Sequence, residues 1–303
     1  MPPRRILVTG AAGFVGQHLL PALRHAFPDA VLTEARFDIT DPPAVQDGIA
    51  DARPDALVHL AAIAAPAQAR EAPDAAWQVN LHGTLNVARA TPRGCTLLFA
   101  SSADAYGASF RPGRKLDEMA ALAPLNLYGA TKAAADLALG AMAAEGLQVI
   151  RARPFNHTGP GQSDAFVVPA FARQVARIAT GEQAPVLQVG ALDPQRDFLD
   201  VRDVCAAYAA ALAHRDRLEP GTILNIASGQ PRRVGDVLHA LLAAAGVEAE
   251  VRTEAARLRP TDIPRAIGDA GRARALLGWA PAIPWEQTLA DVLADWRQRI
   301  RQP

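Results

Sequence analysis

The segment ILVTGAAGFVG, residues 6–16, determines the fold expected for this chain of 303 residues. Its first four residues are apolar or β-branched and favour a short strand, after which Gly10, Gly13 and Gly16 follow at intervals of three. Apolar residues then recur at helical spacing as far as Leu23. A strand, a glycine turn and a helix in this order predict a dinucleotide site, because N–H groups at the helix N-terminus can bind a pyrophosphate.

The three glycines are expected to serve different purposes in that turn. We expect Gly10 to allow the tight turn, Gly13 to let the backbone approach the pyrophosphate, and Gly16 to let helix and strand pack closely. The predicted cofactor contacts of the turn are Gly10, Gly13, Phe14, Val15 and Gly16.

Strand-like runs alternate with helical runs through much of the chain. These runs are residues 6–9, 30–33, 56–60, 96–100, 148–151 and 222–226. Such alternation predicts an α/β fold with a Rossmann-type, doubly wound parallel sheet. From about residue 156, prolines and glycines break the chain into short pieces, which predicts a smaller, mixed α/β substrate-binding cap. The expected division is a dinucleotide-binding domain of residues 1–155 and 196–227, and a cap of residues 156–195 and 228–303.

Composition excludes several classes of partner. The formal net charge is zero and the arginines are dispersed, so we expect no nucleic acid and no membrane surface as partner. Cys95 and Cys205 lie in apolar segments of the sequence, so we expect both to be reduced thiols in the core. Residues 1–5 run straight into the first strand without a signal sequence, which favours the cytoplasm. The seven histidines have no metal-ligand spacing, so no metal is expected.

One of only two lysines lies four residues after a tyrosine, in a chain with 29 arginines. On a helix this spacing places Tyr128 and Lys132 on one face, about one turn apart. A nearby ammonium stabilises the phenolate and so lowers the pKa of a tyrosine. The pair alone is more typical of an exposed helix face, because a lone YxxxK is common by chance. However, the strand-like run 96–100 ends in Ser101 and Ser102, where ligands bind in open α/β sheets, and a serine there can hydrogen-bond both a substrate oxygen and the tyrosine hydroxyl.

Together these motifs resemble the extended short-chain dehydrogenase/reductases that act on nucleotide sugars. The matching segments, in family order, are residues 9–16, HLAA at 59–62, VNLHGT at 79–84, the serines at 101–102 and the YxxxK at 128–132. The resemblance implies that Tyr128 is the general acid or base at a carbonyl oxygen and that Ser102 stabilises the developing charge there. It also implies that Lys132 binds the nicotinamide ribose and lowers the pKa of Tyr128.

The resemblance further implies an adenine side and a nicotinamide side of the cofactor site. An acidic residue ending the second strand suits a ribose 2′-hydroxyl and an arginine suits a 2′-phosphate, and this chain offers both Glu34 and Arg36. Arg36 favours NADP(H), with NAD(H) as the alternative. The other implied cofactor contacts are Asp38, Ile39, Leu60, Ala61, Ala62, Asn80, Tyr128 and Lys132.

The substrate side is implied by three further segments of the same family. They are RPFNHTGPGQ at 153–162, RDFLDVRD at 196–203 and LRPTD at 258–262. Two arginines suit a diphosphate, because each presents paired donors in a fixed plane. The implied substrate contacts are Ser102, Asp104, Asn156, Arg196, Arg259 and Asp262.

Three reactions compete within the family, namely 4-keto reduction, C4 epimerisation and 4,6-dehydration. Ala103 stands where dehydratases carry an acid, and an alanine cannot move a proton. The substrate-side segments most resemble GDP-6-deoxy-D-mannose reductases, although Asp104 replaces their glutamate. This implies NAD(P)H-dependent reduction of a GDP-4-keto-6-deoxyhexose to GDP-D-rhamnose or a C4 relative. The alternatives are a nucleotide-sugar 4-epimerase with tightly bound NAD and a catalytically silent NADP(H)-binding regulator.

Two expected helices predict an oligomer. Residues 77–90 and 128–145 are apolar or small around most of the helix circumference, and such helices must be buried on more than one side. Members of the family pair these helices across a twofold axis into a four-helix bundle, which implies a homodimer. Burial within one subunit is the alternative.

Overall fold

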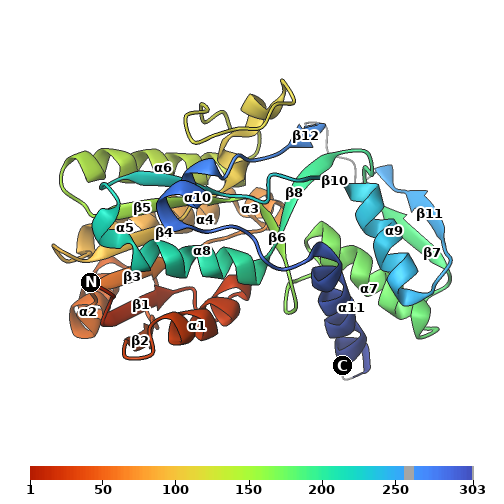
Figure 1. Cartoon of the computed structure of the whole chain (residues 1–303), viewed down its shortest axis with the longest axis horizontal. Coiled ribbons are helices and arrows are strands. Elements are labelled where there is room, and N and C mark those ends of the chain that lie inside the picture. The colour runs from red at the N-terminus through yellow and green to blue at the C-terminus, as the bar shows by residue number, and fades with distance from the viewer. Residues whose placement is uncertain (256–262, 302–303) are drawn as a thin grey trace.

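The computed structural model describes residues 1–255 and 263–301, which form two packed parts joined by a small sheet (Figure 1). The larger part holds a six-stranded parallel sheet in the order β2-β1-β3-β4-β5-β9. Its strands are β1 (Arg5–Thr9), β2 (Val31–Glu34), β3 (Ala56–His59), β4 (Thr96–Ala100), β5 (Val149–Pro154) and β9 (Thr222–Ile226). The predicted Rossmann-type parallel sheet is therefore confirmed.

Helices cover both faces of this sheet because successive strand residues point to opposite sides. Ile6 and Val8 of β1 belong to one buried apolar cluster, and Leu7 between them belongs to another. The first cluster packs under α1 (Phe14–Ala26), α8 (Val201–Ala213) and α10 (Gly271–Leu277). The second packs under α2 (Pro42–Ala52), α5 (Thr84–Ala90) and α6 (Leu127–Ala144).

Short helical segments complete this part around the ends of the strands. Against α6 pack α3 (Pro66–Glu71), α4 (Pro73–Trp77) and the π-helical segment η1 (Gln78–Gly83). Three short 3₁₀ turns are η2 (Ala103–Ala105), η3 (Gly107–Phe110) and η4 (Arg215–Arg217). π-helical turns are rare and often occur at functional sites. The strand ends beside η1 are therefore a candidate location for the functional site.

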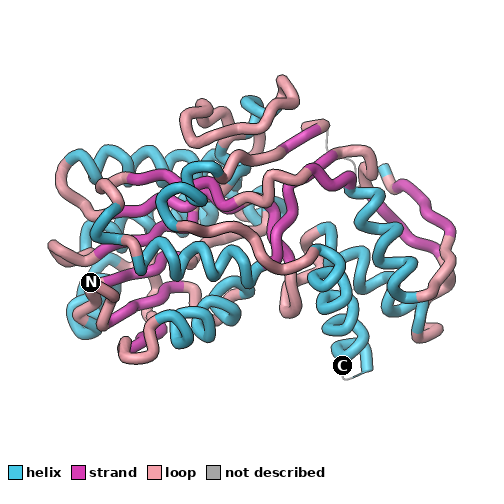
Figure 2. Tube along the Cα trace, in the orientation of Figure 1, coloured by secondary structure: helices cyan, strands magenta, loops and turns pink. Residues whose placement is uncertain are grey.

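The smaller part has its own apolar core between three helices and a pair of parallel strands. These elements are α7 (Val167–Ala179), α9 (Val234–Ala245), α11 (Trp285–Arg301), β7 (Val186–Val189) and β11 (Glu250–Thr253). A second sheet runs between the two parts, with β8 central (Figures 1 and 2). Its strands are β6 (Asn156–Thr158), β8 (Gln195–Asp200), β10 (Pro231–Arg233) and β12 (Arg265–Ala266).

One segment packs differently from the predicted division of the chain. Residues 228–303 are assigned to the cap from the sequence, yet Ala273 and Leu277 of α10 and the nearby Trp279 lie in the apolar cluster of the Rossmann sheet. The Trp279 indole Nε1 also donates a hydrogen bond to the Asp203 carbonyl at 3.0 Å. A helix of seven residues is too short for its pattern to show which core it joins. The rest of the proposed division stays a prediction.

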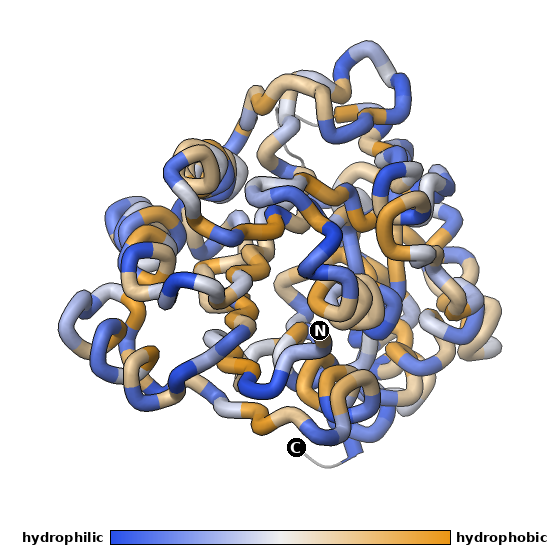
Figure 3. The backbone as a smooth tube through the Cα atoms, turned by 60° about the vertical axis from the view of Figure 1, so that its left-hand side comes forward, coloured by the Kyte–Doolittle hydropathy of each residue, from blue (hydrophilic) through white to orange (hydrophobic). Residues whose placement is uncertain are grey.

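The apolar segments of the chain lie mainly inside the molecule, where the buried residues form three clusters, and polar segments lie mainly on the outside (Figure 3). Within residues 1–255 and 263–301, no helix combines the length and apolar character needed to cross a membrane. The same residues contain no group of three or more histidine, cysteine and acidic side chains placed to hold a metal ion.

Close backbone contacts explain the glycines of the first turn. Gly10 has φ of +70°, and a Cβ there would lie 2.6 Å from the Ala61 nitrogen in the loop after β3. A Cβ on Gly16 would lie 2.3 Å from the Ala11 carbonyl oxygen. Gly16 is therefore required by the turn itself, and not by helix–strand packing as the sequence analysis expects.

We predict that Gly16→Ala destabilises the fold by about 3 kcal/mol or more. The added methyl group would clash with the Ala11 carbonyl, so the backbone of the turn would have to move. Gly246→Ala is the control, since Gly246 ends α9 with φ of +66° and open space around its Cβ position. Only conformational strain of about 1 kcal/mol is expected there. Urea denaturation of both variants measures the difference, and equal losses would contradict the steric account.

Candidate active site

The candidate site lies at the carboxyl ends of β1, β3 and β4, where parallel sheets bind their ligands. The glycine turn follows β1, the segment Leu60–Ala62 follows β3, and Ser101 and Ser102 follow β4. Helix α6 brings Tyr128 and Lys132 to the same edge and packs against η2. The structure thus collects the predicted motifs in one place although they span about 120 residues of sequence.

The glycine turn fits a dinucleotide pyrophosphate. Helix α1 begins at Phe14 with Gly13 as its N-cap, and it has neither a capping side chain nor an acidic residue in its first turn. Its first N–H groups are therefore available to a phosphate, which the helix dipole also favours. Val15 lies in this first turn, and the Phe14 ring stacks on His157 at 6.2 Å between centroids.

The predicted adenine-side residues lie after β2, at the edge of the sheet. Glu34 and Arg36 are both exposed. The Asp38 carboxylate accepts hydrogen bonds from the Thr40 nitrogen and hydroxyl, which lower the pKa of Asp38. Ile39 is buried, and a Cβ on Gly83 would lie 2.7 Å from its Cδ1 atom. Ile39 therefore fixes this loop against η1.

Asn80 connects the loop after β3 to the helix of the catalytic pair. Its Oδ1 accepts a hydrogen bond from the Ile63 nitrogen at 2.8 Å. Its Nδ2 donates to the Ile63 carbonyl at 3.1 Å and to the Thr131 hydroxyl at 3.0 Å. The Thr131 hydroxyl in turn donates to the Tyr128 carbonyl at 2.8 Å. Asn80 thus positions the first turn of α6 relative to the cofactor loop.

His59 extends this network to the first strand. The HLAA motif at 59–62 contains this residue but does not indicate its role. The Thr84 hydroxyl donates to the Asn80 carbonyl, so it must accept a hydrogen bond from His59 Nε2 at 3.0 Å. Burial favours the neutral ring, in which a proton on Nε2 leaves Nδ1 to accept from the Thr9 hydroxyl at 2.7 Å.

Burial lowers the pKa of His59 to about 3, and the charge of Lys132 adds to this effect. The unfolded chain takes up this proton near pH 6.5, whereas the folded protein does not until about pH 3. Stability is therefore lost as the pH falls through this window, by about 1.4 kcal/mol per pH unit. Between about pH 6.5 and pH 5 the loss from His59 alone is about 2 kcal/mol.

We predict that His59→Gln flattens this part of the stability profile, because glutamine keeps an amide for hydrogen bonding but does not titrate. Free energies of unfolding at pH 7 and pH 5, from urea titrations of both proteins, give the comparison. An identical pH dependence in both proteins would show that His59 is not held neutral.

Ser102, Asp104 and Tyr128 form the centre of the candidate site. The Ser102 hydroxyl accepts a hydrogen bond from the Asp104 nitrogen at 3.1 Å and also interacts with the Tyr128 hydroxyl. The Asp104 carboxylate accepts from Asn126 Nδ2 at 3.3 Å, and Asn126 caps α6 through a 2.7 Å bond from the Gly129 nitrogen. A Cβ on Gly129 would lie 2.6 Å from the Asp104 carbonyl oxygen, so this glycine lets α6 approach η2.

The expected lowering of the Tyr128 pKa is wrong for the protein without its ligands. Burial and the Asp104 charge raise the pKa of Tyr128, and the hydrogen bond with Ser102 opposes them only in part. Lys132 is 3% exposed, and its Nζ donates to the Ala100 carbonyl at 2.7 Å and lies 4.9 Å over the Phe99 ring. Burial lowers the pKa of Lys132 to about 8, against the effect of Asp136. The Tyr128 phenol is therefore protonated at neutral pH.

A buried charge cluster stands behind Lys132 and is missed by the sequence analysis. Asp136 lies one turn after Lys132 and is fully buried. Arg153 forms two hydrogen bonds to its carboxylate, at 2.8 and 2.9 Å, and Arg151 forms a third at 3.1 Å. Arginine holds the pKa of Asp136 below its usual range despite burial. The signals in the sequence are the i, i+4 spacing from Lys132 and the Arg-x-Arg pattern of β5.

Apart from Ser102 and Asp104, which follow β4, two of the predicted substrate contacts lie on the second sheet. Asn156 is exposed at the start of β6 and pairs in register with Phe198 of β8. Arg196 of β8 donates from Nη1 to the Ile263 carbonyl at 2.7 Å and to the Gln195 carbonyl at 3.0 Å. Arg259 and Asp262 lie outside the described residues. Asn156 and Arg196 therefore lie on neighbouring strands between the two parts of the protein.

Comparison with known proteins places these motifs in a family. The family model described as NAD dependent epimerase/dehydratase family matches residues 6–227. The chain belongs to this epimerase/dehydratase family. It is 40% identical to GDP-6-deoxy-D-mannose reductase of Pseudomonas aeruginosa over 305 aligned residues, which cover 99% of each chain. The resemblance inferred from the motifs is therefore confirmed.

Solved structures of related proteins agree with the described fold. The structure of RMD from Pseudomonas aeruginosa complexed with NADPH superimposes with a TM-score of 0.89 at 37% identity, covering 97% of this chain and 99% of that one. UDP-glucose 4-epimerase of Thermus thermophilus complexed with NAD has a TM-score of 0.82 at 29% identity, again with 97% and 99% coverage. Reductases and epimerases of the epimerase/dehydratase family thus share this architecture.

Proposed function

We propose that this protein is an NAD(P)H-dependent reductase of the 4-keto group of a GDP-4-keto-6-deoxyhexose, giving GDP-D-rhamnose or a C4 relative. The observation that carries the proposal is the 40% identity with GDP-6-deoxy-D-mannose reductase over 99% of both chains. Ala103 supports it, because the position after Ser102 has no acid or base for the elimination of water. The 4-epimerase reading has weaker support, at 29% identity for UDP-glucose 4-epimerase of Azospirillum brasilense.

The side chains of the site suit proton delivery to a ketone. Bound nicotinamide cofactor supplies the hydride. Tyr128 is protonated at neutral pH, which is the state needed to donate a proton to the C4 oxygen. The Ser102 hydroxyl, which interacts with Tyr128, is positioned to hydrogen-bond the same oxygen and stabilise its charge. Lys132 is the proposed ligand of the nicotinamide ribose.

NADP(H) is the favoured cofactor and NAD(H) the alternative. RMD of Pseudomonas aeruginosa has been solved with NADPH, and the Thermus thermophilus epimerase with NAD. In this chain the exposed Arg36 follows β2, where a 2′-phosphate can be paired with a guanidinium. Glu34, at the end of the same strand, is the residue that would instead suit a free 2′-hydroxyl.

We predict that Tyr128→Phe binds NADPH normally but loses about 100- to 10,000-fold in kcat, which is the usual contribution of a positioned general acid. The change removes one oxygen and leaves the ring and its packing in place. Single-turnover measurements with saturating substrate give the chemical rate, and fluorescence titration of NADPH provides the control. A variant with the wild-type rate would remove Tyr128 from the mechanism.

The proposed reaction also predicts which substrates cause NADPH oxidation. We expect oxidation of added NADPH with GDP-4-keto-6-deoxymannose and none with GDP-mannose alone, because GDP-mannose has no ketone to reduce. Absorbance at the NADPH band follows the reaction, and chromatography of the nucleotide sugars identifies the products. Formation of a 4-keto-6-deoxy sugar from GDP-mannose by this protein alone would indicate a dehydratase instead.

We further propose a cytoplasmic homodimer that pairs residues 77–90, from the end of α4 through η1 and α5, and helix α6 across a twofold axis. The cytoplasm is supported by Cys95 and Cys205, which are both free and buried. The dimer is supported by Leu137 of α6, which is 59% exposed on an otherwise alanine- and leucine-rich helix.

Leu137→Arg is therefore expected to dissociate the dimer, because an arginine at this position would bring two charges together near the twofold axis. Light scattering after gel filtration measures the mass. Leu276→Arg on α10 is the matched control, since Leu276 is also exposed, at 40%, but lies outside the proposed bundle. A dimer that survives Leu137→Arg unchanged would contradict the four-helix arrangement.

A further inference from the structure

Two arginines lie directly opposite each other in the sheet between the two parts of the protein. Strands β8 and β10 are antiparallel, and Arg196 of β8 is the register partner of Arg232 of β10. Opposed residues of an antiparallel pair point to the same face, with Cβ atoms about 5 Å apart. An anion bound at this face could therefore contact both side chains.

The face that carries these arginines is the one turned towards the cap. Phe198 lies two residues after Arg196, so its side chain is on the same face, and it belongs to the buried core of the cap. Phe198 stacks on Trp285 of α11 at 5.5 Å between centroids and 21° between ring planes. The guanidinium carbon of Arg232 lies over the same Trp285 ring, 4.8 Å from its centroid.

Trp285 thus holds the Arg232 guanidinium by its flat face, which leaves the N–H groups at its edge for a ligand. Among residues 1–255 and 263–301, Arg232 forms no ion pair, and its buried Nε has no hydrogen-bond acceptor. Two carboxylates are near enough to act on its charge, those of Glu286 and Asp197. Asp197 is already the acceptor for Ser228, Gly229 and Gly268, and Glu286 is exposed.

We propose that Arg232 binds the diphosphate of the nucleotide-sugar substrate together with Arg196. This inference rests on the proposed function, which supplies a diphosphate ligand, and it assigns a role to a residue in none of the family motifs. A diphosphate carries enough negative charge to satisfy two guanidinium groups, and each can offer it paired donors. The bound substrate would then connect β10, β8 and the start of α11.

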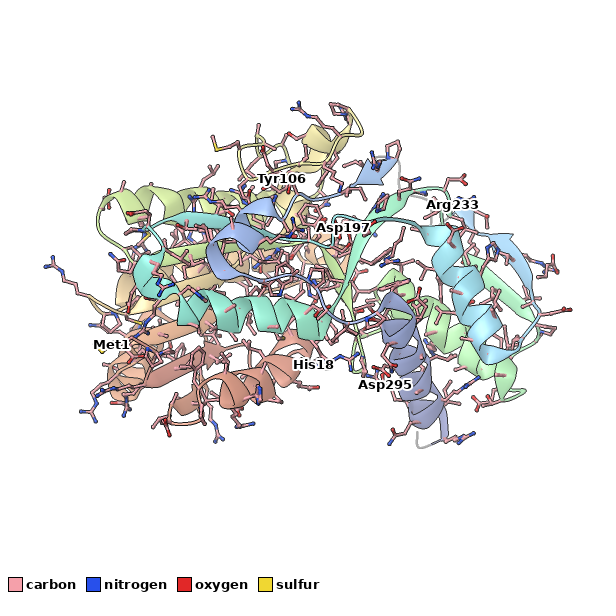
Figure 4. All side chains as sticks on the ribbon, viewed as in Figure 1. Met1, His18, Tyr106, Asp197, Arg233 and Asp295 are labelled. Carbon is pink, nitrogen blue, oxygen red and sulfur yellow. The ribbon has the colours of Figure 1, made fainter. Side chains whose placement is uncertain are left out.

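Arg233 provides a matched control on the same strand. It is the next residue, so its side chain points to the other face, where Asp193 and Asp236 pair with it. Figure 4 labels Arg233 at the end of β10 beside α9, and Asp197 closer to the Rossmann part. Replacing Arg233 removes the same charge from the same strand without touching the proposed diphosphate site.

The test is calorimetric titration of GDP, GMP and NADPH into wild-type protein and into Arg232→Ala, Arg232→Lys and Arg233→Ala variants. Arg232→Ala is expected to weaken GDP binding about 10- to 100-fold, as expected for loss of a hydrogen bond between charged groups, and to weaken GMP binding less. Arg232→Lys keeps the charge but loses the paired N–H donors and the stacking of the planar guanidinium on Trp285. Its affinity for GDP should therefore lie between those of Arg232→Ala and the wild type. Arg233→Ala should bind GDP as the wild type does, and all variants should bind NADPH normally.

The outcomes separate this inference from the proposed function. GDP binding that is equal in wild type and Arg232→Ala overturns the role of Arg232 and leaves the reductase proposal standing. An equal loss in Arg233→Ala also overturns it, because the effect would then be general charge and not a site. If the wild-type protein binds NADPH but no nucleoside diphosphate, both proposals fail together.

Discussion

The buried hydrogen-bond chain through His59 and Asn80 is the constraint on which the rest of the site depends. It starts at Thr9 beside the glycine turn, passes through the neutral imidazole and Thr84, and reaches Thr131 and the Tyr128 carbonyl through Asn80. Each O–H and N–H bond of these side chains has its own acceptor, so the orientation of every group follows from its neighbours. The ends of β1 and β3 and the start of α6 are thereby held in one arrangement.

The protonation states follow from this burial and not from the tyrosine–lysine pair alone. Burial and the charge of Asp104 raise the pKa of Tyr128, while the Lys132 ammonium donates a hydrogen bond to the Ala100 carbonyl. A protonated phenol is the form that donates a proton, so the site is prepared for reduction of a ketone. Asp136, with its two arginines, maintains the negative charge that favours the ammonium form of Lys132.

Sequence patterns predicted the fold because its signals are local. The strands and the glycine turn occupy short, contiguous segments, and the edge where Ser102, Tyr128 and Lys132 meet follows from the topology of a parallel sheet. The polar chain could not be predicted, because three of its bonds join residues 25 to 51 positions apart. The same holds for α10, whose packing on the Rossmann sheet has no pattern of its own. The pKa of Tyr128 is raised by burial and by Asp104, whose backbone can approach α6 because Gly129 has no side chain.

The most direct test of the account is the fate of a deuterium label during one turnover. NADPH deuterated at the transferred position of the nicotinamide is mixed with GDP-4-keto-6-deoxymannose, and the sugar product is analysed by nuclear magnetic resonance. The account predicts deuterium at C4 of the product and one equivalent of NADP⁺. A product without deuterium at C4, or a changed sugar with no net oxidation of NADPH, would contradict it.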